Sequence, residues 1–271
     1  MIAIMLRYTP SAQMSFYMRL IDTHCHFDHP LFDADRDERV RSMNANGVSD
    51  VIFPATTAAG WGRLRDIAYT SAHFHASYGL HPMFMTQHQD KHIAQLRQWL
   101  EHERPVAVGE CGLDFFVADP DKQRQISLFE QHIRLAREFD LPLIIHARKS
   151  LDEVLKPIRR LGSLRGVIHS FSGSQQQAEQ LIEQGFYLGV GGTATYDRAK
   201  RLHKVIMNVP LERILLETDA PDQPDSQWRG KRNEPGRLPV IANTVAALTG
   251  TTIETIARTT TGNAQQLFGI A

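Results

Sequence analysis

Two histidines one residue apart, His24 and His26 in the stretch LIDTHCHFDH, are the first residues that could carry chemistry. Residues at i and i+2 share one face of a strand, so both imidazoles could reach one cation where a strand ends. A pair of polar residues in a turn is the more common explanation of this spacing. The rest of the chain therefore has to decide whether the pair binds a metal.

Other ionisable residues also follow short apolar runs. They are Glu110 in AVGECGLDFF, His146 in LIIHARKS, His169 in VIHSFSG, and Glu217 and Asp219 in LLETDAP. One such histidine is usually a buried core residue, but a repeated pattern of this kind predicts a shared site. Imidazole with carboxylate suits Zn, Mn, Fe or Co, and suits Mg or Ca less well.

The number of these residues indicates more than one cation. A catalytic metal takes three or four protein ligands and keeps a position open, whereas the four histidines with Glu110 and Asp219 exceed that number. A carboxylate can bridge two cations with its two oxygens, which favours a two-metal site. Thiolate ligands are not expected, because Cys25 and Cys111 alternate with the ligand candidates and should face the outer helices.

Parallel strands of a barrel would position such residues. Apolar runs without alternation are typical of strands buried on both faces, and we expect them at 19–24, 50–55, 75–80, 105–110, 141–146, 165–170, 185–190 and 213–218. Helices are expected between them. They include 35–46, 120–139 with Pro120 at its first position, 150–161 with a capping box from Ser150 to Glu153, and 174–184 with one from Ser174 to Gln177.

Eight such units predict an α/β fold, a single TIM (β/α)8 barrel whose active site lies at the C-terminal ends of the strands. A two-domain doubly wound fold is the alternative, but no change in composition marks a boundary. Residues 1–17 are expected to be a loose N-terminal extension, and residues 18–271 to form the barrel domain.

Composition limits the function classes. The 271 residues carry 30 Lys and Arg against 30 Asp and Glu, so no overall field attracts nucleic acid or membrane. Two cysteines fit a reducing, cytoplasmic location. No apolar run approaches the length of a membrane span.

Ordered motifs along the chain resemble the TatD family of metal-dependent hydrolases, and more closely its YjjV-like bacterial branch. These motifs are IDTHCHFD, GLHP, GECGLDFF, LPLIIHAR, HSFSGS, GVGGT and LLETDAP. The resemblance implies a TIM barrel of the amidohydrolase superfamily and a divalent-metal hydrolase, commonly a deoxyribonuclease. Many other binuclear amidohydrolases bridge their metals with a modified lysine, but Glu110 stands at that position here.

The resemblance also implies roles for individual residues. It assigns His24, His26 and Asp219 to the first metal, His146 and His169 to the second, Glu110 to both, and His81 to the neighbourhood of the substrate. Glu217 would either orient a ligand or form an ion pair beneath a loop.

The expected reaction is hydrolysis by a water activated between two divalent cations, with Zn, Mn or Mg as candidates. Glu110 and Asp219 would be the catalytic residues, with Asp219 accepting the proton of the water. Arg148, Arg229 and Arg232 could grip a phosphodiester, although a solvated loop would explain them too.

The expected partners are DNA ends or a small phosphodiester, with neither a membrane nor an obligate protein partner. One alternative is hydrolysis of another substrate, such as an aminoacyl ester or an amide. A non-catalytic metal-binding protein is disfavoured, because none of the strand-end ligand candidates is missing.

Overall fold

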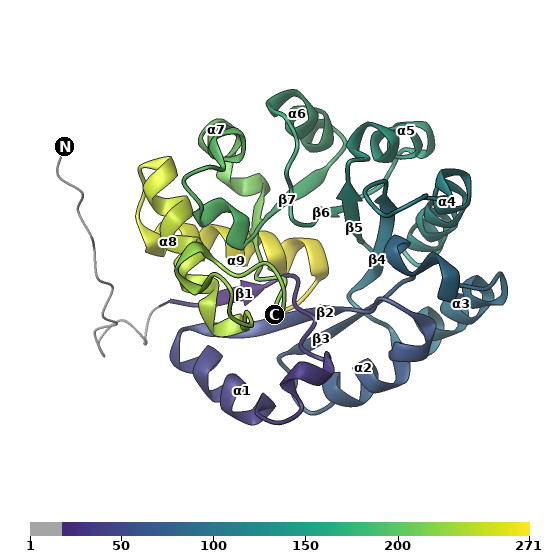
Figure 1. Ribbon diagram of the computed structural model, residues 1–271, viewed down its shortest axis with the longest axis horizontal. Coiled ribbons are helices and arrows are strands. Elements are labelled where there is room, and N and C mark those ends of the chain that lie inside the picture. Colours follow the sequence, from purple (N-terminus) through teal and green to yellow (C-terminus); the bar gives the residue numbers. More distant parts are fainter. Residues whose placement is uncertain (1–17) are drawn as a thin grey trace.

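The computed structural model describes residues 18–271 and shows a barrel of parallel strands inside a ring of helices (Figure 1). Eight strands are paired in the order β1 to β8, each parallel to the next. This architecture confirms the predicted TIM barrel and excludes the doubly wound alternative. The expected N-terminal extension, 1–17, lies outside the described residues.

The strands follow the apolar runs closely. They are β1 (Leu20–Asp22), β2 (Val48–Pro54), β3 (Phe74–Tyr78), β4 (Ala107–Asp114), β5 (Leu143–Arg148), β6 (Gly166–Ile168), β7 (Phe186–Val190) and β8 (Ile214–Leu216). The helices are α1 (Arg36–Ala45), α2 (Trp61–Ala68), α3 (Lys91–Glu103), α4 (Lys122–Glu138), α5 (Leu151–Leu161), α6 (Gln175–Glu183), α7 (Lys200–Asn208), α8 (Leu238–Thr249) and α9 (Ile253–Phe268).

The first residues of α4 and α5 correct two predictions. α4 begins at Lys122 rather than at Pro120, because Asp121 caps it by accepting a hydrogen bond from the Arg124 N–H at 3.0 Å. Ser150 does not form a capping box, because its hydroxyl donates to the carbonyl of Leu113 at 2.7 Å. The box from Ser174 to Gln177 is confirmed.

The interior of the barrel is filled at its N-terminal end, which we call the floor. Ile21, Ile144 and Leu215 from three strands pack there with Leu267 and Phe268 of α9. The helix therefore closes the floor, and the ligand candidates lie at the opposite end of the barrel. We call that end, where the strands terminate, the mouth.

A larger apolar layer lies between the strands and the outer helices, and it includes both cysteines, fully buried and free. No single described helix is long and apolar enough to cross a membrane. One bent pair, Pro235–Thr249 with Ile253–Phe268, reaches the length and apolar composition of a membrane span when its two helices are taken together. Residues of both helices are buried against the barrel.

The seam between β8 and β1 closes through the segments that follow the two strands. The Thr23 N–H donates to the carbonyl of Leu216 at 3.0 Å, the Asp219 N–H to that of His24 at 2.8 Å, and the His26 N–H to that of Ala220 at 2.8 Å. Closure of the barrel therefore fixes the backbone of three ligand candidates.

A polar cluster at the floor surrounds the buried carboxylate of Asp50. It accepts hydrogen bonds from Arg19 at 3.0 Å, Ser49 at 2.6 Å and His75 at 3.1 Å. Burial would raise the pKa of Asp50, but these bonds outweigh it and hold the pKa well below its usual range. Arg19 also donates to the carbonyl of Ala271 at 2.6 Å, which ties the end of the chain to the floor.

Candidate metal centre

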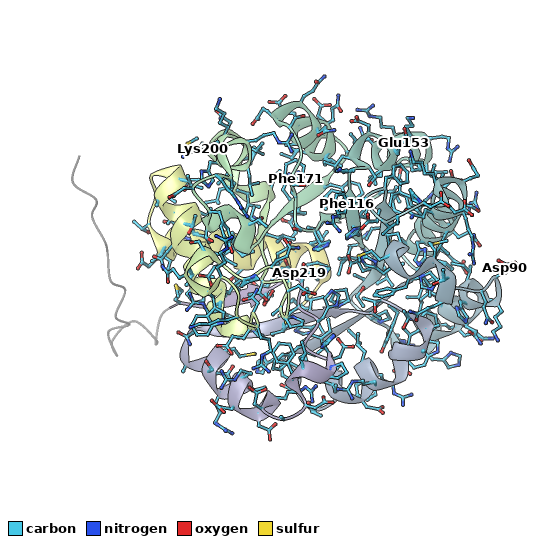
Figure 2. All side chains as sticks on the ribbon, in the orientation of Figure 1. Asp90, Phe116, Glu153, Phe171, Lys200 and Asp219 are labelled. Atoms are coloured by element: carbon cyan, nitrogen blue, oxygen red, sulfur yellow. The ribbon has the colours of Figure 1, made fainter. Side chains whose placement is uncertain are left out.

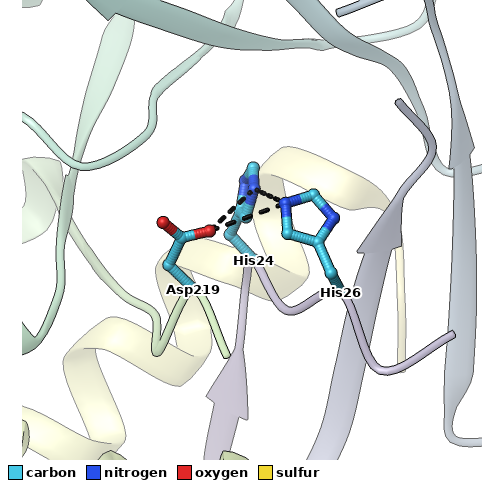
Figure 3. Close-up of side chains that lie close together, drawn as sticks. All are labelled: His24, His26 and Asp219. Carbon is cyan, nitrogen blue, oxygen red and sulfur yellow. Dashed lines mark hydrogen bonds and ion pairs between the residues drawn. The ribbon is translucent and has the colours of Figure 1, made fainter. Parts of the chain in front are cut away.

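His24, His26 and Asp219 meet at the mouth (Figure 3). Their ligand atoms all lie within 4.8 Å of one another. Asp219 Oδ1 is 3.6 Å from the Nε2 atom of each histidine, and the two Nε2 atoms are 3.4 Å apart. The geometry suits one cation held between two imidazoles and a carboxylate.

Glu110 lies at the centre of the cluster and is almost fully buried. Its Oε2 faces His24 Nε2 at 3.3 Å and His26 Nε2 at 3.6 Å. Its Oε1 faces His146 Nδ1 and His169 Nε2, each at 3.1 Å. The two oxygens of one carboxylate thus face two separate pairs of histidines.

Hydrogen bonds at the outer side of two imidazoles set their tautomers. The Nδ1 of His26 lies 3.2 Å from the carbonyl of Pro54, and the Nε2 of His146 lies 2.9 Å from Asp114 Oδ2. Both acceptors need a ring N–H. The other nitrogen of each ring therefore keeps its lone pair and directs it into the cluster.

Asp114 is a functional candidate that the sequence interpretation missed. It is fully buried at the end of β4, and its Oδ1 accepts the N–H groups of Phe116 at 2.8 Å and Val117 at 3.2 Å. β4 was expected to end near Glu110 but continues to Asp114. An acidic residue four positions beyond Glu110, on the same face of an apolar strand, was the available signal.

Glu217 contacts His169 on the side away from Glu110, as Asp114 contacts His146. Its Oε1 lies 3.5 Å from His169 Nδ1 and accepts the N–H of Ser170. Gly189 of the GVGGT motif leaves room for it, since a Cβ at that position would lie 2.4 Å from Glu217 Oε2. This contact favours the role of orienting a ligand.

His81 lies beside Glu110, with its Nε2 2.9 Å from Oε1. Its Nδ1 accepts the Met83 N–H at 3.0 Å, so the proton of the neutral ring is on Nε2 and points at Glu110. Burial lowers the pKa of His81 to about 4, which keeps the ring neutral. In this tautomer His81 donates to Glu110, although His81, Glu110 and His146 also lie close enough together to form a further candidate metal group.

The cluster opens into a cavity of about 1020 Å³ whose lining includes His26, His81, His146, His169 and Asp219. Asp219 lies inside the ring of helices in Figure 2. All six ligand candidates are thus brought together at one end of the barrel. Their assignment as ligands stays a prediction.

The cationic residues of the cavity differ in part from those expected. Arg148 lines it, as do Arg198 and Arg201, which the sequence interpretation did not select. Arg229 is not among the lining residues. Arg232 is not either, because its guanidinium forms two hydrogen bonds with Asp35, at 2.9 and 2.6 Å.

The chemistry of the cluster fits divalent cations. Glu110 Oε2 is buried without a hydrogen-bond partner in the described part of the chain, although imidazole nitrogens face it. Lone pairs and anionic oxygens that converge in a buried site need a positive charge between them. A set of nitrogen and oxygen donors is typical of Zn or Mn sites.

Comparison with known proteins identifies the family. The family model described as TatD related DNase matches residues 21–269. The chain belongs to the TatD family. This membership confirms the resemblance that the ordered motifs indicated.

Curated TatD relatives cover nearly the whole chain. The uncharacterized metal-dependent hydrolase YjjV of Escherichia coli K12 is 40% identical over 255 residues, which are 93% of this chain and 98% of YjjV. The uncharacterized metal-dependent hydrolase YabD of Bacillus subtilis is 33% identical, over 93% of this chain and 99% of YabD. The chain therefore belongs to a family of metal-dependent hydrolases.

Solved structures agree with the TatD fold. The crystal structure of YjjV from Escherichia coli matches with a TM-score of 0.90 and 39% identity, over 94% of this chain and 100% of YjjV. A TatD family hydrolase from Entamoeba histolytica matches with a TM-score of 0.83 at 20% identity, over 94% of this chain and 99% of that protein, which supports the fold alone.

Proposed function

We propose that this TatD-family chain is a cytoplasmic hydrolase of phosphodiester bonds that uses two divalent cations, Zn, Mn or Mg. Its proposed substrates are DNA ends or short phosphodiesters. The observation that carries the proposal is Glu110, whose two oxygens face two separate pairs of histidines. A carboxylate placed in this way suits a bridge between two cations.

His24, His26 and Asp219 would hold the first cation, and His146 and His169 the second. When bound, such cations lower the pKa of water and neutralise charge that develops on phosphoryl oxygens. Glu110 would offset part of the repulsion between them. Asp219 directs Oδ1 into the site while its other oxygen accepts a hydrogen bond from Gln223, so its carboxylate can take the proton of an attacking water.

The cavity wall supports a phosphate-containing substrate. The exposed side chains of Arg148, Arg198 and Arg201 line it, and none of them forms an ion pair with a carboxylate of residues 18–271. Guanidinium groups bind phosphate oxygens through paired N–H donors. A neutral ester or amide would not need three such groups.

The test is turnover after metal reconstitution. Protein stripped with a chelator and reloaded with Zn, Mn or Mg should cleave oligonucleotides, with product lengths resolved, and should leave phosphomonoester, carboxylic ester and amide substrates nearly unchanged. Turnover of an ester or amide without phosphodiester cleavage would overturn the proposal. Full metal content without turnover of any substrate would favour a non-catalytic metal-binding protein.

A further inference from the structure

A second cavity of about 630 Å³ adjoins the one that holds the metal centre. The two cavities share Ala147, Ser172 and Arg201 in their linings. The second extends away from the metal ligands, over the segments that lead into α4, α5 and α6. We call it the annex. A substrate longer than one phosphodiester could therefore continue from the first cavity into the annex.

The annex carries cations that form no ion pair with the described residues. Lys122, Lys149 and Arg201 line it with exposed side chains, and within the described chain none of them has a carboxylate at ion-pair distance. Of its two acidic residues, Glu153 pairs with Lys156 at 2.5 Å, and Asp152, which accepts a hydrogen bond from the neutral Gln177 at 2.7 Å, is outnumbered by the three cations. The free charge of the annex is therefore positive.

An exposed aromatic ring lies beside one basic residue of each cavity. Phe116 is 50% exposed and lies inside the ring of helices (Figure 2). The guanidinium of Arg148, which lines the first cavity, is 3.8 Å from its ring centroid, and Lys149 Nζ of the annex is 4.5 Å from it. A large apolar side chain held open to solvent beside two cations is a suitable surface for stacking a nucleobase.

The backbone of Lys149 makes glycine a suitable replacement for testing the role of its side chain. Lys149 has a φ of 54°, in the left-handed region that favours glycine. A residue with a Cβ there costs about 1 kcal/mol or more relative to glycine. Lysine brings no compensating contact with the core, since its side chain is exposed. Lys149→Gly therefore removes the ammonium group without straining the backbone.

We propose that the annex binds the phosphate next to the scissile one in a single-stranded oligonucleotide, with the intervening base stacked on Phe116. This inference rests on the proposed phosphodiesterase function and names its substrate class. Lys149 and Lys122 contact the backbone phosphate, and Arg201 lies where the chain passes from one cavity to the other. Recognition depends on the charge and the stacking face, so it tolerates any base sequence.

The first measurement is steady-state kinetics of the manganese-loaded full chain on oligothymidylates of two, four and eight nucleotides. KM should fall at least about fivefold from the dinucleotide to the tetranucleotide, the lower end of what one stacked base contributes. Oligouridylates of the same lengths distinguish RNA from DNA. A KM independent of length in both series would overturn the inference while leaving the phosphodiesterase function intact.

The second measurement is binding of a fluorescein-labelled oligothymidylate of eight nucleotides, followed by anisotropy in excess chelator so that no hydrolysis occurs. Lys149→Gly should weaken binding and reduce the salt dependence, by about 0.7 in the slope of log K against log salt. Phe116→Ala should weaken binding about fivefold or more. Lys204→Gln, an equal loss of charge on the exposed side of α7, is the matched control and should bind like the unmodified chain.

Weaker binding by Lys149→Gly would not result from unfolding. The variant relieves the positive φ and should be at least as stable as the unmodified chain. Binding lost equally in Lys149→Gly and Lys204→Gln, or in neither, would overturn the inference. Length-dependent binding that Lys149→Gly abolishes, in a chain that cleaves no phosphodiester, would support the annex and overturn the proposed function instead.

Discussion

Replacing Asp114 by asparagine should weaken metal binding without unfolding the barrel. Asp114 Oδ2 holds the Nε2–H of His146 at 2.9 Å, and Oδ1 accepts two backbone N–H groups at 2.8 and 3.2 Å. In Asp114→Asn, an amide oxygen that keeps the backbone bonds turns its NH2 group toward His146. The imidazole then moves its proton to Nδ1, the atom that faces Glu110, and loses the lone pair needed for a cation.

The alternative orientation of the amide is also costly. If the oxygen turns toward His146, the NH2 group faces the N–H groups of Phe116 and Val117, and two buried donors lose their acceptor. Either arrangement costs about 1–3 kcal/mol, the penalty of buried donors left without partners. That range corresponds to about 5- to 150-fold weaker binding of the cation that His146 contacts, at 1.4 kcal/mol per tenfold.

Competition with a chromogenic chelator would measure the zinc affinity of the variant, and mass spectrometry its metal content. Asp119→Asn is the matched control, since Asp119 is exposed on the loop that follows the same strand. It should bind zinc like the unmodified chain. If the zinc affinity of Asp114→Asn instead stays within twofold of that of the unmodified chain while thermal unfolding shows the fold intact, Asp114 does not set the tautomer of His146.

Three further predictions concern other parts of the chain. Glu110→Gln should reduce the content of both metals and cut turnover about 10²-fold or more, measured by mass spectrometry and oligonucleotide cleavage; retention of both metals with near-normal turnover would contradict the bridging role. Gly189→Ala should lower the free energy of unfolding by about 1–3 kcal/mol in denaturant titrations, because its methyl group would press on Glu217. The matched change Gly262→Ala, on α9 with open space around it, should raise that free energy by up to about 1 kcal/mol. Asp50→Asn should cost about 2 kcal/mol at pH 7. Because folding lowers the pKa of Asp50, this difference should shrink as the pH falls below about 4, and a constant difference down to pH 2 would refute its origin.

The barrel could be predicted from the sequence because strands buried on both faces appear as plain apolar runs. The site could be predicted because parallel strands end together, so that residues as distant as His24 and Asp219 must meet at one mouth. Asp114 was not predicted as a site residue because the end of a strand is poorly marked in sequence. The carboxylate four positions beyond Glu110 is a signal only if β4 continues that far, and GECGLDFF does not mark where the strand ends.

The residues of the cavity wall depend on loops, and this is why part of the prediction failed. Arg232 follows β8, as a phosphate-binding residue would, but its partner Asp35 is 197 positions away in the chain. Local sequence cannot reveal a pairing of that kind. Arg198 and Arg201 reach the cavity from the segment before α7 and from its first turn, in the stretch YDRAKRL. A basic cluster after a strand was the available signal.

The hydrogen bond from Arg19 to the carbonyl of Ala271 has a practical consequence for tethering the protein. It fixes the C-terminus at the floor, on the side of the barrel opposite the mouth. A linker added after Ala271 therefore leaves the molecule pointing away from the metal centre and the annex. Protein anchored to a sensor chip or bead through that linker should present its mouth to the surrounding solution. Oligonucleotide-binding assays on the immobilised protein can use this orientation, because the support does not cover the cavity.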